Sequence, residues 1–405
     1  MELRNAMAGI LALGWSLNAP AQIDPYKREL IQLGYNQPLQ GKAPIAAYGF
    51  YYLNKPEFFR TNLTLRLAVA PVYLDGELGI AQALGEHTDA GLGLFGGGFA
   101  ESYSEIRGGQ WLRGESFTGH GGGVSASVYH LFNPGRQIPL YGVLRAVARG
   151  AVYDEDSETA ANFRLPDNVT SFDFRAGVRL GGNEPLILPP LAMELSAWYE
   201  AQLRTQEQDY GFNGDRQLES ASHRFWGRAM LTYTLPRLKH RFALSLTSGV
   251  SLHADRFSAY RLGGMLPLSS EFPLALPGYY YQELSAQSFA LFGGNYTLPL
   301  DEGQRWSLNI MGASAYVNYL PGLEEPRHWN SGVSGGVVYR SPSDSWQLLV
   351  AYGYGLSAQR SGGHGAHTIG ALVQFDLGGT RQRLLNPGEN PNRSRGLGRL
   401  LQIFR

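Results

Sequence analysis

Most of this sequence is divided into segments of roughly ten residues in which apolar and polar side chains alternate, separated by turn-forming residues. In the clearest segment, Trp346 to Leu356, the even-numbered positions are apolar, and the odd-numbered positions are small or polar except for Leu349. Similar alternation occurs in segments 172–180, 193–204, 242–253 and 368–377. Successive side chains of a strand point to opposite faces of the sheet. The pattern therefore predicts many β-strands, each with one apolar and one polar face.

Alternation also occurs in soluble β-sandwiches, and three further features favour a transmembrane barrel. The strands are long and numerous with almost no helical period between them, and one face carries Arg and acidic side chains in mid-strand while the other is apolar. The third feature is that short and long connections alternate, as periplasmic turns and external loops do in barrels. The short ones lie near 86–89, 132–138, 235–240, 301–304 and 341–344, and the long ones near 104–115, 154–169, 207–218, 254–283 and 320–328. We therefore predict an all-β protein, a transmembrane antiparallel β-barrel.

The number of strands follows from parity. Fifteen strands are evident after residue 40, whereas a bacterial barrel needs an even number if both ends are periplasmic. A weaker segment at 28–36 supplies the sixteenth strand and places every long loop on the outside. We predict 16 strands within residues 28–378. Trp306, Tyr319, Trp329 and Trp346 lie near strand ends, as in interfacial aromatic girdles.

The two ends of the chain differ from this pattern. Residues 1–21 are interpreted as a signal peptide, with Arg4 before an apolar stretch and small residues at 19–21, and residues 22–27 as a short periplasmic lead. No later window has 18 uninterrupted apolar residues, so no transmembrane helix is expected. Residues 379–405 are a basic periplasmic tail. That tail is either a segment that binds an anionic surface, peptidoglycan or a partner, or a disordered linker.

Composition excludes several classes of function. The chain has no Cys, which rules out disulfides, thiolate metal ligands and cysteine nucleophiles. Lys+Arg and Asp+Glu are equal at 34 each, so no nucleic-acid partner is indicated. No phosphate-binding or dinucleotide motif occurs, and we expect no cofactor.

Charged residues share the predicted inward face. Their arrangement indicates either an ion-selective or anion-attracting pore, or an ion-pair network that packs the lumen and its inserted loop, and the second interpretation is favoured. They are Arg66, Arg145, Arg149, Asp173, Arg175, Arg179, Glu194, Glu200, Arg224 and Arg228.

Two histidine-containing stretches are weaker candidates. His364 and His367 have an i, i+3 spacing that could bind a metal, but their glycine-rich surroundings favour a solvated external turn. His120 could activate Ser116 for hydrolysis, but no third orienting residue is apparent. No metal site and no enzymatic activity are therefore predicted.

The longest predicted loop, 254–283, falls between strands 11 and 12, with five strands after it. This layout resembles that of the BamA/TamA outer-membrane assembly superfamily (the bacterial surface antigen barrel), whose sixth loop folds back into the lumen. The resemblance rests on loop residues that match the family's "RLGG … RGY … E" pattern. They are Arg261, Gly263, Gly264, Pro277, Gly278, Tyr279 and Glu283. The last strand carries Thr368, Gly370, Val373 and Phe375, similar to the pattern of a barrel assembly signal.

The sequence departs from that family at three points. Pro277 stands where the family has Arg, and Tyr316-Val317-Asn318 stands where the loop-facing strand of the family has an aromatic-x-Asp segment. Both partners of an Arg–Asp pair are thus absent, which costs less than losing one. About six residues separate the predicted signal from the first strand, so the periplasmic repeat domains that receive clients are not expected. The resemblance supports the fold far more than the activity.

What the resemblance implies is an integral protein of the bacterial outer membrane that aids insertion or transport of proteins. Its expected partners are outer-membrane lipid and lipopolysaccharide, the barrel assembly machinery during biogenesis, and unfolded outer-membrane clients. A passive or gated pore for small solutes is the alternative, and an outer-membrane lipid-modifying enzyme is a distant third.

Overall fold

The computed structural model describes residues 27–44, 46–136, 138–182, 193–235, 237–266 and 273–377. The predicted signal peptide, the lead up to residue 26 and the basic tail 379–405 lie outside the described residues. Within the described residues, no helix is long and apolar enough to cross a membrane.

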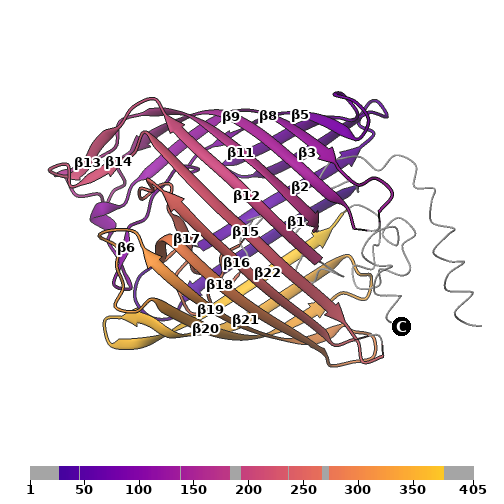
Figure 1. Cartoon of the computed structure of the whole chain (residues 1–405). Helices are drawn as coiled ribbons and strands as arrows, with labels where there is room; N and C mark the ends of the chain where they lie inside the picture. The colour runs from indigo at the N-terminus through magenta and orange to yellow at the C-terminus, as the bar shows by residue number, and fades with distance from the viewer. Residues whose placement is uncertain are drawn as a thin grey trace, which may run out of the picture.

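The chain forms one large antiparallel sheet that closes on itself as a barrel (Figure 1). The sheet has 17 strands, of which the three-residue β17 (Tyr260–Leu262) is an addition inside the barrel, so 16 strands form the wall. These are β1 (Arg28–Pro38), β2 (Ala46–Pro56), β3 (Leu63–Ala70), β4 (Tyr73–Ile80), β5 (Thr88–Gly97), β8 (Thr118–Leu131), β9 (Leu140–Asp154), β11 (Val169–Gly181), β12 (Met193–Arg204), β15 (Ala221–Thr234), β16 (Arg241–Leu252), β18 (Leu284–Pro299), β19 (Trp306–Tyr319), β20 (Trp329–Arg340), β21 (Trp346–Arg360) and β22 (Gly363–Asp376). The predicted count of 16 strands is confirmed, including the weak first strand.

The barrel closes by pairing its first strand with its last. β1 and β22 are antiparallel, in a register that runs from Leu30 opposite Asp376 to Pro38 opposite Thr368. On the inner face of this seam, the side chain of Gln32 donates a hydrogen bond to Gln374 over 3.1 Å. Among the described residues, each of the 16 wall strands is paired on both sides, which removes the exposed backbone groups that an open sheet would present.

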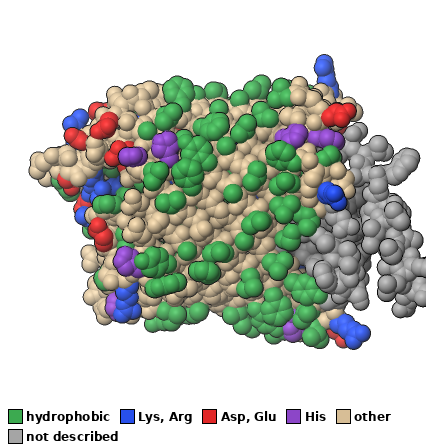
Figure 2. All heavy atoms as spheres, in the orientation of Figure 1, with side chains coloured by type: hydrophobic (Ala, Val, Ile, Leu, Met, Phe, Trp, Pro, Cys, Tyr) green, Lys and Arg blue, Asp and Glu red, His purple; other side chains and the backbone are tan. Residues whose placement is uncertain are grey.

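Alternation along the strands separates the two faces of the wall. In β21, Val350, Tyr352 and Leu356 are exposed on the outside, whereas Gln347 and Ala351 are buried on the inside. Figure 2 shows that hydrophobic side chains are spread over the outer wall, while Lys, Arg, Asp and Glu gather at its two ends. This apolar band is the surface that transmembrane barrels present to lipid.

The two ends of the barrel carry different connections. The described turns between β8 and β9, β18 and β19, and β20 and β21 are short and share one end, which we call the turn end. The opposite, loop end carries the connections 98–117, 155–168, 205–220, 253–283 and 320–328. Two connections at the loop end are much shorter, at 71–72 and 361–362.

At the loop end, three of the long connections form a cap with its own small core (Figure 1). Residues 98–117 contain β6 (Ile106–Arg107), β7 (Gln110–Trp111) and the 3-10 turn η1 (Arg113–Glu115). A separate three-stranded sheet joins β10 (Phe163–Arg164), β13 (Gln208–Phe212) and β14 (Arg216–Leu218). The cap is held together by aromatic packing, with Phe257 against its buried residues Tyr103, Phe117, Phe163, Tyr210 and Leu218.

Candidate functional site

The connection between the eleventh wall strand, β16, and the twelfth, β18, is residues 253–283, which we call the inner loop, and the structure describes two arms of it, 253–266 and 273–283. Its first arm contains β17, which pairs with the start of β18, from Tyr260 opposite Ala286 to Leu262 opposite Leu284. The two arms then pair with each other, since the amide of Leu276 donates to the carbonyl of Gly264 over 2.8 Å. In the described arms of the inner loop, backbone groups around β17 and Gly264 are therefore satisfied by strand pairing.

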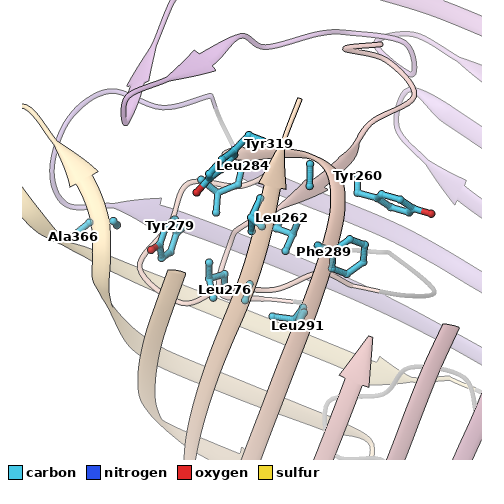
Figure 3. Close-up of a cluster of buried hydrophobic side chains, with 13 residues drawn as sticks. Tyr260, Leu262, Leu276, Tyr279, Leu284, Phe289, Leu291, Tyr319 and Ala366 are labelled. Atoms are coloured by element: carbon cyan, nitrogen blue, oxygen red, sulfur yellow. The ribbon is translucent and has the colours of Figure 1, made fainter. Parts of the chain in front are cut away.

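Apolar residues of the inner loop pack against the inner wall. Figure 3 shows Leu262, Leu276 and Tyr279 of the loop beside strand residues that include Phe289 and Leu291. The wall contributes small and apolar residues to this cluster, which are Ala286, Phe289, Leu291, Ala315, Val317, Tyr319, Ala358 and Ala366. Almost all of these side chains are fully buried, so the inner loop forms a second core inside the barrel.

Glycines allow the backbone of the inner loop to touch the wall directly. Gly278 has a φ of +83°, and a Cβ atom there would lie 1.8 Å from the amide nitrogen of Gly355 on β21. A Cβ atom on Gly332 of β20 would lie 2.0 Å from the carbonyl oxygen of Pro277. Only glycine permits both the positive φ and this approach. The Pro277-Gly278 turn is thus seated between β20 and β21.

A buried ion pair fixes the same turn. Arg360, at the end of β21, makes a bidentate contact with Glu283, at 2.7 Å and 3.1 Å, and also donates to the carbonyl of Gly278 over 3.2 Å. Glu283 in turn accepts the amide of Tyr280 at 2.6 Å. Tyr279 completes the anchor by donating from its hydroxyl to Asn330 of β20 over 3.2 Å. Bidentate Arg–carboxylate geometry of this kind is both strong and orienting.

The inner loop also spans the barrel seam. Its Met265 and Leu266 lie against Gly370 of β22, where a Cβ atom would come within 2.7 Å and 3.0 Å of them. On the other side of the seam, the hydroxyl of Tyr280 donates to the carbonyl of Gln40, in the connection between β1 and β2, over 3.0 Å. The ring of Tyr280 also lies 3.7 Å from the guanidinium of Arg360. One loop therefore contacts the strands on both sides of the closing pair.

The structure corrects the expected role of Tyr316 and Asn318. Tyr316 is 43% exposed and Asn318 is also exposed, on the outer face of β19, whereas Val317 between them is fully buried against the inner loop. Successive residues of a strand face opposite sides, so an alignment offset of one residue reverses the face. The loop-facing residues of β19 are Ala315, Val317 and Tyr319.

Opposite the inner loop, the inner wall carries charges instead of small residues. Arg149 of β9 contacts Glu101 at 3.0 Å and Asp173 of β11 at 3.2 Å. Glu200 of β12 contacts Arg224 of β15 at 2.6 Å and Arg175 of β11 at 3.5 Å. We call this part of the wall, formed by β9, β11, β12 and β15, the ionic wall.

Towards the turn end of the ionic wall, Glu194 is buried between two guanidinium groups. Arg179 lies 3.1 Å from its carboxylate, and Arg228 forms a second, shorter contact. Arg145 of β9 donates to the hydroxyl of Ser125 on β8 over 3.1 Å, and further round the barrel Arg66 of β3 pairs with Glu77 of β4 at 2.7 Å. All the predicted lumen charges are therefore on the inner face, and most of them form a network of ion pairs.

The residues of the predicted assembly signal lie on both faces of β22. Thr368 is fully buried beside Met265, and Gly370 lies under the inner loop, whereas Phe375 is 37% exposed on the outside. Val373 shares the outer face with Phe375 and is half-buried.

Arg261, the first residue of the predicted loop motif, donates to the carbonyl of Ser104 in the cap over 2.7 Å.

The histidine candidates occupy different surroundings from those expected. His364 and His367 lie within β22 rather than in a loop, and an i, i+3 spacing in a strand places them on opposite faces. Within the described residues, no group of three His, Cys, Asp or Glu could hold a metal ion. His120 lies 3.2 Å from Asp154. Ser116, however, is buried in the cap, where it accepts from Glu105 and Trp111.

Sequence reasoning missed Arg360, which is central to the anchor. Arg360 and Glu283 are 77 residues apart in the chain, and no local pattern links them. One sequence feature did mark the contact region of the inner loop on β21. It was Leu349, the apolar residue on the otherwise small or polar face of that strand. It packs with Ala46, Leu266 and Leu372 beside the seam, and so marks where the inner loop rests.

Comparison with known proteins identifies the barrel type. No protein-family model and no curated protein sequence matches the chain. Among solved structures, the chain is similar to CdiB from Escherichia coli (TM-score 0.57, 10% identity, 87% of this chain and 64% of that chain). It is similar to CdiB from Acinetobacter baumannii (0.55, 12%, 87% and 60%) and to a BamA structure from Haemophilus ducreyi that lacks POTRA domains 1–3 (0.53, 11%, 91% and 78%).

These matches show that the chain shares the barrel fold of CdiB and BamA. The chain spans less than two thirds of the length of either CdiB chain.

Proposed function

We propose that this protein is an integral barrel of the bacterial outer membrane that assists the insertion or transport of other proteins at its seam. The observation that carries the proposal is the position of the inner loop. It packs on β20, β21 and β22 on one side of the seam, and through Tyr280 it reaches the β1–β2 connection on the other. The similar folds of CdiB and BamA support the same assignment by analogy.

The outer wall supports the membrane location. Its apolar side chains form a band between two charged ends, as Figure 2 shows, and the lumen side is polar over the ionic wall. Transfer of this surface into water would expose large apolar side chains on nearly every strand. In this location, the turn end faces the periplasm and the loop end, with its cap, faces outward.

A seam that opens would present two strand edges. β1 and β22 would each expose unpaired amide and carbonyl groups, which template the pairing of an additional strand. The inner loop opposes this opening because its contacts bridge the two sides. Release of the loop from Arg360 and Gly370 would leave the closing strands held by their own backbone pairs and the Gln32–Gln374 hydrogen bond.

The test uses a disulfide across the seam, because the chain contains no Cys of its own. Gln32 and Gln374 are directly opposed across β1 and β22, so the double variant Gln32→Cys/Gln374→Cys locks the seam when oxidised. The control Gln347→Cys/Gln374→Cys shares Gln374 and locks β21 to β22 instead, leaving the seam free.

Each protein is reconstituted in liposomes beside a porin of similar size, and the folding rate of an added unfolded outer-membrane protein is followed. We expect faster client folding with the wild-type protein than with the porin, loss of this acceleration on oxidation of the seam variant, and recovery after reduction. The control variant should remain active in both states. Equal rates with the protein and the porin, or acceleration that survives the seam lock, would refute the proposal.

A second candidate function, a gated pore for small solutes, is favoured by one observation. A cavity of about 370 Å³ remains between the inner loop and the ionic wall, and it is lined by arginines. Planar-bilayer conductance separates the two functions. A current that rises several-fold when Arg360→Met releases the inner loop would support a gated pore.

A further inference from the structure

The cavity inside the barrel is lined by ionisable side chains from several elements. Arg149 of β9 and Arg224 of β15 approach it from the ionic wall, Arg256 and Arg261 from the inner loop, and Glu101 from the cap. These side chains are only partly buried, with Arg149 26%, Arg224 33% and Arg256 14% exposed. The space thus combines four guanidinium groups with one carboxylate.

The acidic partners around the cavity do not balance these arginines. Glu200 is shared by Arg224 and Arg175. Glu105, which contacts Arg256 at 3.3 Å, also has Arg107 at 3.5 Å and Arg216 at 3.8 Å. Glu200 and Glu105 are thus each shared by two or three arginines, whereas Arg149 has two carboxylate partners, Glu101 and Asp173. An excess of positive charge in a partly enclosed space attracts a mobile anion, since low-dielectric walls strengthen the field.

Arg261 is the clearest unpaired group. Within the described residues it has no carboxylate partner, and its contacts are the carbonyl of Ser104 and the ring of Tyr103, 5.0 Å from the guanidinium carbon. Its Nε atom is buried and has no acceptor among the described residues. Unsatisfied buried donors of this kind indicate a missing acceptor.

We propose that this cavity binds a small oxyanion that carries two or more negative charges, of the phosphate class. Guanidinium groups match phosphate oxygens through paired N–H donors, and the lining brings Arg261 of the inner loop and Arg224 of β15, which also contacts Glu200, to the same space. Gln282 and Ser102 add neutral polar groups to the lining. A volume of about 370 Å³ admits a phosphate or pyrophosphate but no folded segment of protein. This inference stands whether or not the barrel transports proteins.

The experiment measures binding of inorganic pyrophosphate to the full chain folded in detergent, by isothermal titration calorimetry at fixed ionic strength. Acetate is the monovalent comparison. We expect saturable binding of pyrophosphate, at least about tenfold tighter than acetate because two charge-assisted contacts replace one. Arg261→Gln should weaken pyrophosphate binding about tenfold, whereas Glu101→Gln, which removes the lining carboxylate, should strengthen it.

Two controls keep the result interpretable. Arg305→Gln removes an exposed arginine in the turn between β18 and β19, at the far end of the barrel, and should leave the affinity unchanged. Arg261→Lys retains the charge without the planar donor pair and should give an intermediate affinity. Circular dichroism establishes that each variant is folded. The proposal is overturned if pyrophosphate gives no saturable heat, or if Arg261→Gln and Arg305→Gln bind it equally.

Discussion

Two regions of the inner wall differ in their side chains. The region formed by β18 to β22 is lined by glycines and apolar residues, many of them small, and the inner loop rests on it with direct backbone contact. The ionic wall keeps its large charged side chains paired with one another across neighbouring strands. Both regions have the same antiparallel backbone pairing. The difference shows that residue size on the inward face decides where a loop can be seated and where the lumen must be filled by side chains.

The largest effect is expected on the ionic wall, at Glu194. Its carboxylate is buried between Arg179 and Arg228, so Glu194→Gln removes the negative charge that both guanidinium groups contact. We expect the free energy of unfolding to fall by about 3–5 kcal/mol. Denaturant unfolding in detergent measures this, with exposed Glu302→Gln as the control. A change as small as that of the control would show that the ionic wall is solvated rather than tightly paired.

The anchor of the inner loop should show strong coupling. Glu283→Gln and Arg360→Met each leave a buried partner unpaired, whereas the double variant removes both groups. A double-mutant cycle on unfolding should give a coupling free energy of about 1–3 kcal/mol. Additive effects would contradict the bidentate contact. Limited proteolysis should also show the inner loop released in both single variants.

The direct contact between the inner loop and the wall can be tested by a matched pair of glycine substitutions. Gly278→Ala places a Cβ atom against β21 at a positive φ, and we expect a loss of about 1–3 kcal/mol in unfolding free energy. Gly335→Ala adds the same atom on β20 where nothing lies within 4 Å, and stability should be unchanged. Equal effects of the two substitutions would argue against direct contact between the inner loop and the wall.

A smaller, pH-dependent effect is expected where the β19–β20 connection meets the cap. Glu325 accepts the amide of Gly108 at 2.8 Å, and burial raises the pKa of its carboxyl above the ordinary value. Folding then favours the protonated acid, so this stabilisation is complete below the ordinary pKa and is lost as pH rises through the raised value. The unfolding midpoint of Glu325→Gln, minus that of the wild type, should therefore increase as the pH rises above the ordinary pKa of a Glu carboxyl. A difference that is constant with pH would exclude the shift.

The smallest effect concerns the pair expected by family resemblance. Pro277→Arg and Asn318→Asp restore the two family residues, but Asn318 faces outward, away from the inner loop. The two substitutions should therefore be additive in unfolding free energy, with coupling below about 0.5 kcal/mol. A stabilising coupling of 1 kcal/mol or more would show that β19 presents the opposite face to the loop.

The fold could be predicted from sequence because each strand carries its own evidence. Alternation fixes the two faces, loop lengths fix the two ends, and parity recovers the weak strand at Arg28–Pro38. The site was harder to predict from sequence because its key contacts join residues that are far apart in the chain. Glu283 could be singled out from the loop motif, but nothing near it in the chain indicated Arg360. The wrong face predicted for Tyr316 and Asn318 is a related case. A motif match located the correct stretch of β19, but it did not determine which residues of the strand face the inner loop.

The uneven loop end has a consequence for access from outside the cell, given the proposed orientation. The connections nearest the seam are short, with residues 361–362 joining β21 to β22 and residues 39–45 joining β1 to β2, and residues 71–72 joining β3 to β4 further along the rim. The tall cap rises from β5, β8, β9, β11, β12 and β15, away from the seam. The rim of the loop end is thus low beside the seam and high where the cap covers it. In the proposed role, a segment leaving through the seam would reach the outer surface without passing beneath the cap.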